Sequence, residues 1–161
     1  MKILIGGSSS KYFHLNAFSE YLKNKHVETL LVQDVNYVNG FPSRNYLQWL
    51  FPKNYIKNLI QNFKPDLIFV DRPRHFALES VKQRIPTLIH LRGDFWSEIK
   101  WAKETKYKKF PKNIVIKKWE EMGKEIFENA KCMLPICKFL ENKIQQQHPK
   151  KMTHVLYQGI D

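Results

Sequence analysis

The sequence predicts an α/β fold: an open, mainly parallel sheet with helices on both faces. Short aliphatic or β-branched runs alternate with stretches of helical periodicity along the whole chain, which is the pattern of strands joined by crossover helices. The runs are almost continuously apolar, as expected for strands that are covered on both faces. With 161 residues, the chain has the length of one ordinary domain. We therefore expect a single domain over residues 1–161.

Six strands are predicted, each from a short apolar run with polar residues, proline or glycine beside it. They cover residues 2–5, 27–32, 66–70, 87–91, 131–136 and 153–157. Gly6 and Gly7 close the first run, and we expect this strand at the centre of the sheet.

Helices are predicted where apolar residues recur at helical spacing. Two such stripes are Ile56, Leu59, Ile60 and Phe63, within a helix over 54–63, and Val115, Trp119, Met122 and Ile126 further on. Three more helices are predicted over residues 12–25, 75–84 and 138–147. The apolar stripes are interpreted as core rather than as ligand contacts.

Composition excludes several classes of protein. Hydrophobic residues make up 43% of the chain, which excludes a disordered protein. The longest apolar runs are far shorter than the roughly 20 residues that cross a bilayer, and the first residues lack the apolar stretch of a secretory signal. We therefore expect a cytoplasmic protein. The histidines and cysteines form neither of the common zinc patterns, so no metal is expected.

The loops after the strands are the places to look for chemistry, because ligands of an open parallel sheet bind outside the carboxyl ends of its strands. The first of these loops begins with Gly6, Gly7 and Ser8. Glycines allow an anion to approach the backbone closely, so this loop is a candidate phosphate site. The alternative is a tight turn followed by a serine cap.

Arginine follows the strand predicted at 66–70. The guanidinium group of Arg72 suits bidentate contact with a phosphate or a carboxylate. In the alternative interpretation, Asp71 pairs with an arginine in a solvated loop, where an ion pair contributes little. His90, in the strand predicted at 87–91, is either a core residue or part of the same site.

The loop after residue 91 has the most distinctive composition. Arg92, Gly93, Asp94 and Trp96 combine a cation, a flexible residue, a carboxylate and an aromatic ring directly after a strand. Such groups can hydrogen-bond sugar hydroxyls and stack on the face of a sugar ring. The sequence therefore indicates a sugar or polyol site.

A basic segment with interleaved aromatic residues follows this loop. Its members are Lys100, Trp101, Lys103, Lys106, Tyr107, Lys108, Lys109 and Phe110, and the whole chain has a formal net charge of +12. Lysines attract anionic lipid headgroups, at about 1 kcal/mol each, and aromatic rings settle at the membrane interface. A solvated lysine face and a nucleic-acid contact are the alternatives.

Taken in order, these motifs resemble the N-terminal half of a GT-B glycosyltransferase of the retaining family 4 type. The resemblance rests on Gly6 and Gly7 after the first strand and on residues 64–68 (KPDLI), 90–96 (HLRGDFW), 134–140 (LPICKFL) and 155–161 (VLYQGID). It covers the whole chain. It implies a Rossmann-like domain, one half of a GT-B fold, with a C-terminal donor-binding domain that this chain lacks.

The resemblance also implies a function. The intact enzyme would move a sugar from a nucleotide-sugar donor to a lipid-linked or glycan acceptor, without a cofactor or metal, at the inner face of the cell membrane. Gly6, Gly7 and Ser8 would approach the donor diphosphate, and Arg72, His90, Arg92, Gly93, Asp94 and Trp96 would face the acceptor. No catalytic base is assigned. The alternative is a stand-alone basic module that binds nucleic acid, although no nucleic-acid partner is expected.

Overall fold

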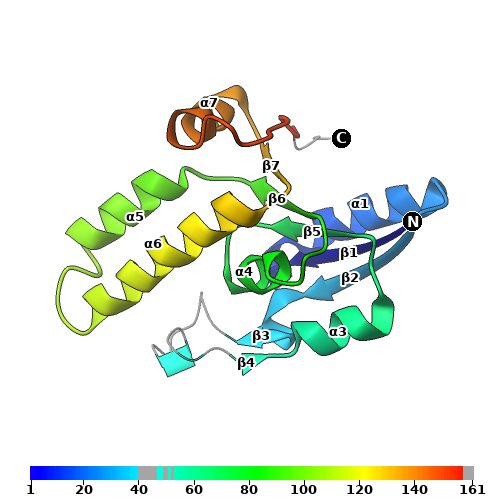
Figure 1. The fold of residues 1–161 in the computed structure, drawn as a ribbon, viewed down its shortest axis with the longest axis horizontal. Coiled ribbons are helices and arrows are strands. Elements are labelled where there is room, and N and C mark those ends of the chain that lie inside the picture. The colour runs from blue at the N-terminus through cyan, green and yellow to red at the C-terminus, as the bar shows by residue number, and fades with distance from the viewer. Residues whose placement is uncertain (40–46, 49–50, 52, 158–161) are drawn as a thin grey trace.

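In the computed structural model, which describes residues 1–39, 47–48, 51 and 53–157, five parallel strands form one sheet (Figure 1). The strands are β1 (Lys2–Gly7), β2 (Glu28–Gln33), β5 (Leu67–Asp71), β6 (Thr87–Leu91) and β7 (Cys132–Pro135). Their order is β2-β1-β5-β6-β7, and each neighbouring pair is parallel. The prediction of a mainly parallel α/β sheet is confirmed. β1 is an inner strand, but β5 stands at the centre, because both β1 and β6 pair with it.

Helices cover both faces of this sheet, and the apolar side chains alternate between them. α1 (Tyr12–Asn24) packs on one face, where Leu15 meets Ile3, Ile5 and Phe69. The other face carries Leu4, Ile68, Val70 and Ile89. On it lie α3 (Ile56–Phe63), α4 (His75–Val81) and α6 (Lys112–Asn129). Strands buried on both sides explain why the apolar runs of the sequence are nearly continuous.

Three elements have no counterpart in the sequence prediction. β3 (Val38–Asn39) and β4 (Lys53–Asn54) form a separate antiparallel pair. Residues 95–104, expected as a loop followed by a basic segment, form α5 (Phe95–Glu104). α5 and α6 make a helical hairpin that projects from one end of the sheet (Figure 1).

The sixth predicted strand is present only in part. Residues 152–156 follow α7 (Lys138–Gln147) and run beside β7, with backbone hydrogen bonds from Met133 to Met152, from His154 to Met133 and from Leu156 to Pro135. Only Thr153 forms a β-bridge, with Met133. This short run therefore lies at the edge of the sheet without becoming a regular strand. Residues 158–161, the end of the last motif of the resemblance, lie outside the described residues.

Candidate functional site: an arginine pocket at the carboxyl edge

The carboxyl ends of β5 and β6 bring two of the predicted site residues, His90 and Arg92, beside Asp71. Asp71 is the last residue of β5, and its register partner on β6 is His90. Arg92 follows one residue after β6 ends. Because side chains alternate along a strand, positions 90 and 92 share a face of the sheet, and both side chains reach the carboxylate of Asp71.

Asp71 is the buried anion at the centre of this group. Its side chain is 0% exposed, and its Oδ1 lies 3.4 Å from Nδ1 of His90 and 3.5 Å from Nη1 of Arg92, two side chains that are each only 8% exposed. Burial by itself raises the pKa of Asp71, but the interaction with His90 and the charges of Arg92 and Arg72 outweigh it, so the pKa lies below its usual range,. Asp71 is therefore ionised near neutral pH.

The contacts of this group are nevertheless loose. Both distances exceed those of ordinary hydrogen bonds. Among the described residues, neither Asp71 oxygen has a hydrogen-bond partner, and the same holds for Nε2 of His90 and Nε of Arg72, all of them buried atoms. Buried polar atoms are normally paired, so this edge of the sheet carries unused hydrogen-bonding capacity.

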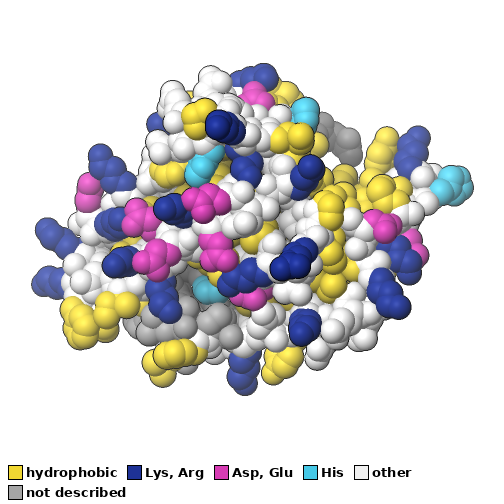
Figure 2. Space-filling view, in the orientation of Figure 1, with side chains coloured by type: hydrophobic (Ala, Val, Ile, Leu, Met, Phe, Trp, Pro, Cys, Tyr) yellow, Lys and Arg dark blue, Asp and Glu magenta, His cyan; other side chains and the backbone are white. Residues whose placement is uncertain are grey.

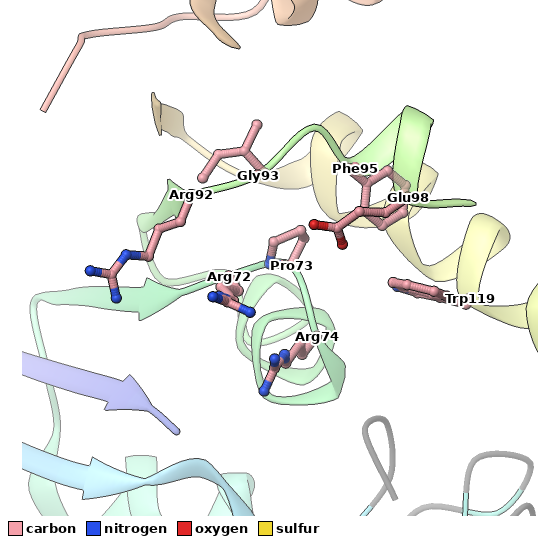
Figure 3. A pocket seen from close by; sticks show the side chains of 9 residues that line it. Arg72, Pro73, Arg74, Arg92, Gly93, Phe95, Glu98 and Trp119 are labelled. Carbon is pink, nitrogen blue, oxygen red and sulfur yellow. The ribbon is translucent and has the colours of Figure 1, made fainter. Parts of the chain in front are cut away.

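A pocket opens beside this group (Figure 3). Its volume is about 100 Å³. It is lined by Arg72, Pro73, Arg74, Leu91, Arg92, Gly93, Phe95, Glu98 and Trp119. Figure 3 shows the three arginines on the side of the pocket next to the strand ends, with Glu98 and Trp119 on the other side. We call this the arginine pocket.

The backbone between β5 and α4 sets the direction of two of these arginines. Arg72 has φ = 81°, in the left-handed region that only glycine enters without strain,. Its backbone N–H donates to the carbonyl of His90 at 2.9 Å, and the N–H of Arg74 donates to the carbonyl of Arg72 at 3.0 Å. The sharp turn thus places two successive arginine side chains, at 72 and 74, on the wall of the pocket.

The charges of the pocket influence one another strongly. Burial lowers the pKa of Arg74, and the neighbouring charge of Arg72 lowers it further, while Asp34, Asp71 and Glu98 act in the opposite direction. Burial raises the pKa of Asp34, and Arg74 opposes that shift. Burial and the charge of Arg72 outweigh these carboxylates, so the pKa of Arg74 lies below its ordinary value.

The glycines predicted for a phosphate loop have a packing role in this structure. Both are buried within β1. A Cβ at Gly6 would lie 2.2 Å from Cε1 of Phe76, and a Cβ at Gly7 would lie 2.2 Å from Cδ1 of Leu15 and 3.4 Å from Cβ of Asp71. Glycine thus lets α4 and α1 pack closely on the strand. Gly7 adjoins Asp71, and Ser8 is the first residue after β1, with its Oγ 3.1 Å from that of Ser10.

Two residues predicted to face an acceptor have structural contacts in the fold. Asp94 caps α5, since its carboxylate accepts from the backbone N–H of Ser97 at 3.1 Å and from the Ser97 hydroxyl at 2.7 Å. Trp96 packs against the rings of Phe127 and His148. Neither residue lines the pocket.

Six of the lining residues are not among the predicted site residues: Pro73, Arg74, Leu91, Phe95, Glu98 and Trp119. Trp119 belongs to an apolar stripe that the sequence predicts as core. The helical start of α5 could have been found from Asp94 and Ser97, since aspartate three residues before a hydrogen-bonding serine is a common way to begin a helix.

The basic segment forms the end of the α5–α6 hairpin. Trp101 is 62% exposed and Phe110 is 77% exposed, and all five predicted lysines are exposed. Tyr107 is the exception: it is buried in the core cluster between the helices, so the prediction that it faces a surface is wrong. Figure 2 shows basic and apolar side chains together at this end of the molecule. We call residues 100–114 the hairpin tip.

Among the described residues, no cluster of three or more histidine, cysteine, aspartate or glutamate side chains could hold a metal ion. No helix in the part of the chain that the structure describes combines the length and apolar character needed to cross a membrane.

Comparison with known proteins adds little to this description. No family model and no curated protein matches the chain. Among solved structures, it is similar to ribose-5-phosphate isomerase B of Clostridium thermocellum with a TM-score of 0.35 and 14% identity, over 99% of this chain and 88% of that one. A likeness of that size carries no functional argument.

Proposed function

We propose that this chain is the acceptor-binding domain of a retaining glycosyltransferase, which acts with a separate donor-binding domain to move a sugar from a nucleotide sugar to a lipid-linked or glycan acceptor. The observation that carries the proposal is the arginine pocket at the carboxyl edge of the sheet. Open parallel sheets bind their ligands at this edge. Here the edge combines guanidinium groups with the aromatic rings of Phe95 and Trp119, the groups that bind and stack on sugars.

The size of the pocket agrees with a partial site. Pockets that enclose a whole small molecule usually measure about 300–1,000 Å³, whereas this one measures about 100 Å³. It therefore has room for one end of an acceptor rather than for a nucleotide sugar. In the proposal, the rest of the site comes from the donor-binding domain.

The hairpin tip supports work at a membrane surface. Its lysines are exposed and lie beside the exposed rings of Trp101 and Phe110. Lysines bring a protein to an anionic leaflet, and aromatic rings hold it at the interface. We therefore place the enzyme at the inner face of the cell membrane, where a lipid-linked acceptor would be found.

The test measures sugar transfer by two forms of the protein, the 161-residue chain alone and the longer polypeptide that we expect its gene to encode. Nucleotide sugars are offered with isoprenoid-linked and free glycans, and products are followed by mass spectrometry. We expect transfer by the longer form only, because donor and acceptor have to be held together in a reactive geometry. Transfer by the short chain, or none by the longer one, contradicts the proposal.

The same preparations test the alternative of a nucleic-acid-binding module. That alternative predicts sequence-independent binding of RNA or DNA that weakens steeply with salt, together with an absence of sugar transfer.

A further inference from the structure

From the geometry of the arginine pocket, we infer that it binds a phosphate group carried by the acceptor, so that the substrate class is a phosphorylated or diphosphate-linked acceptor rather than a neutral glycan. Only the assignment of the phosphate to an acceptor rests on the proposed function. The phosphate site itself is argued from the pocket.

The first argument is that three arginines line one small pocket. Arg72, Arg74 and Arg92 come from two different loops, yet all three belong to its lining, and Figure 3 shows them on the side away from Glu98 and Trp119. Several planar forks around a space of about 100 Å³ match the several oxygens of a phosphate, which guanidinium groups bind in bidentate fashion.

The second argument is the charge around these arginines. Asp71 is already shared by Arg92 and His90. Asp34, which faces Arg74, is buried, and burial disfavours its charged form. Glu98 lies on the opposite wall in Figure 3 and is exposed to solvent. Of the residues that line the pocket, three are arginines and only Glu98 is acidic, so the lining itself favours an anion.

The third argument is the state of Arg72. Its Nε atom is buried and has no hydrogen-bond partner among the described residues. The residue also holds φ = 81°, where glycine would be unstrained. A charged side chain with a buried, unused donor at a position that favours glycine costs the fold stability. Strained residues are common at binding sites, so the unfavourable state of Arg72 is explained if its side chain binds a ligand.

The experiment uses a matched pair of substitutions. Arg72→Gly removes one of the three guanidinium groups of the pocket and relieves the backbone strain of the positive φ. Arg84→Gly makes the same chemical change at another arginine of positive φ, 60°, which is exposed and lies between α4 and β6, at the amino ends of the strands. Binding of inorganic phosphate and pyrophosphate to the chain is measured by calorimetry and by NMR shifts, at low and at moderate salt.

We expect the wild-type chain and Arg84→Gly to bind pyrophosphate equally, and Arg72→Gly to bind it at least about tenfold more weakly, because charge-assisted hydrogen bonds are the strong ones. Both variants should unfold at a denaturant concentration no lower than that of the wild type. Equal binding by all three proteins, equal losses in both variants, or no binding by the wild type would each overturn the phosphate site.

A second pair of probes distinguishes the two sources of phosphate. Farnesyl phosphate stands for an acceptor, and UDP and GDP stand for the donor. Tighter binding of farnesyl phosphate that depends on Arg72 supports the inference. Tighter binding of the nucleotides that depends on Arg72 overturns it, because the pocket would then hold the donor diphosphate.

The two proposals fail in different ways. If the longer protein transfers sugar to phosphorylated acceptors and Arg72→Gly has the wild-type KM for them, the phosphate site is wrong while the glycosyltransferase stands. If pyrophosphate binds through Arg72 but no form of the protein transfers sugar, the phosphate site stands, and both the glycosyltransferase and the assignment of the phosphate to an acceptor are wrong.

Discussion

The arginine pocket and the hairpin tip are both basic, but they hold their charges in opposite environments. In the pocket, the side chain of Arg92 is 8% exposed and contacts a carboxylate that is 0% exposed. At the tip, Lys106, Lys108 and Lys109 project into water. Charges in water interact weakly and are screened by salt, whereas buried charges depend on their partners and are costly when left alone.

The difference separates two kinds of binding. The pocket fixes the position and direction of a few groups and so suits recognition of one small anion. The tip offers several exposed cations and suits a broad anionic surface. Substitutions in the two regions should therefore differ in which property they change: the stability of the fold in the first region, and the affinity for a surface in the second.

The largest effect is expected from Asp71→Asn. This substitution removes the buried carboxylate that His90 and Arg92 share, and breaking a buried ion pair costs about 3–5 kcal/mol. The free energy of unfolding, measured by urea denaturation, should fall by an amount in that range. A loss below about 1 kcal/mol would mean that the ion pair of Asp71 contributes no more than an exposed one. The pocket and the hairpin tip would then not differ in how their charges affect stability.

A smaller effect is expected on acidification of the wild-type chain. The pKa of Asp71 is lowered in the folded protein, so the unfolded state binds more protons at acid pH and stability falls as pH falls. The loss should begin below about pH 4, the ordinary range of an aspartate, and continue down to the lowered pKa. The pKa of Asp34 is raised in the folded protein, so its contribution to stability increases as pH falls.

Unfolding free energies measured from pH 6 to pH 2 check this expectation. In Asp71→Asn the acid-dependent loss should be reduced, because the group that titrates has been removed. An identical pH profile for the two proteins would show that Asp71 does not contribute to acid sensitivity.

Much of the fold could be predicted from the sequence because its strands are buried on both faces, and such strands appear as continuous apolar runs. The edge of the sheet was harder. Residues 153–157 carry a strand-like pattern, yet they only line the outside of β7. The alternation of apolar and polar residues there results from packing against β7 and not from regular strand pairing.

Only the part of the site that comes from the ends of strands and the loops after them could be predicted from the sequence. Arg72 and Arg92 follow strands, and His90 lies near the end of one, and the carboxyl ends of such strands must meet at one edge of the sheet. Trp119 reaches the pocket from α6, far away in the sequence, and no local pattern distinguishes it from a core residue. A carboxylate near a strand end, such as Asp94, can serve a ligand, a helix cap or both, and the cap is visible only once the structure places Ser97 beside it.

A moderate effect is expected at Asp94, where α5 leaves the pocket region for the tip. Asp94→Ala removes the cap seen in the contacts to Ser97 and should lower the unfolding free energy by about 1 kcal/mol. Asp94→Asn keeps a capping residue and should cost much less. If Asp94 also contacted an acceptor, Asp94→Asn would lose sugar transfer in the longer protein while keeping its stability, and transfer at the wild-type rate would assign Asp94 to the cap alone.

The smallest effect on stability, and the largest on surface binding, is expected at the hairpin tip. Replacing Lys106, Lys108 and Lys109 by glutamate should change the unfolding free energy by no more than about 0.5 kcal/mol, since exposed charges contribute little. The same change should release the chain from vesicles rich in anionic lipid, because each lysine near the headgroups contributes about 1 kcal/mol. Vesicle sedimentation at low and moderate salt measures this.

The control for this experiment makes the same charge change elsewhere, by replacing the exposed residues Lys25, Lys57 and Lys131 with glutamate. If the tip is the binding surface, the control keeps most of the binding, and salt weakens what remains, because the Debye length is only about 8 Å at 0.15 M. Equal losses in the two triple variants would mean that the net charge of +12, rather than the tip, attracts the chain to lipid. Substituting Trp101 and Phe110 by serine then isolates the rings: a tip that inserts into the interface loses binding at moderate salt, where attraction by charge alone has already faded.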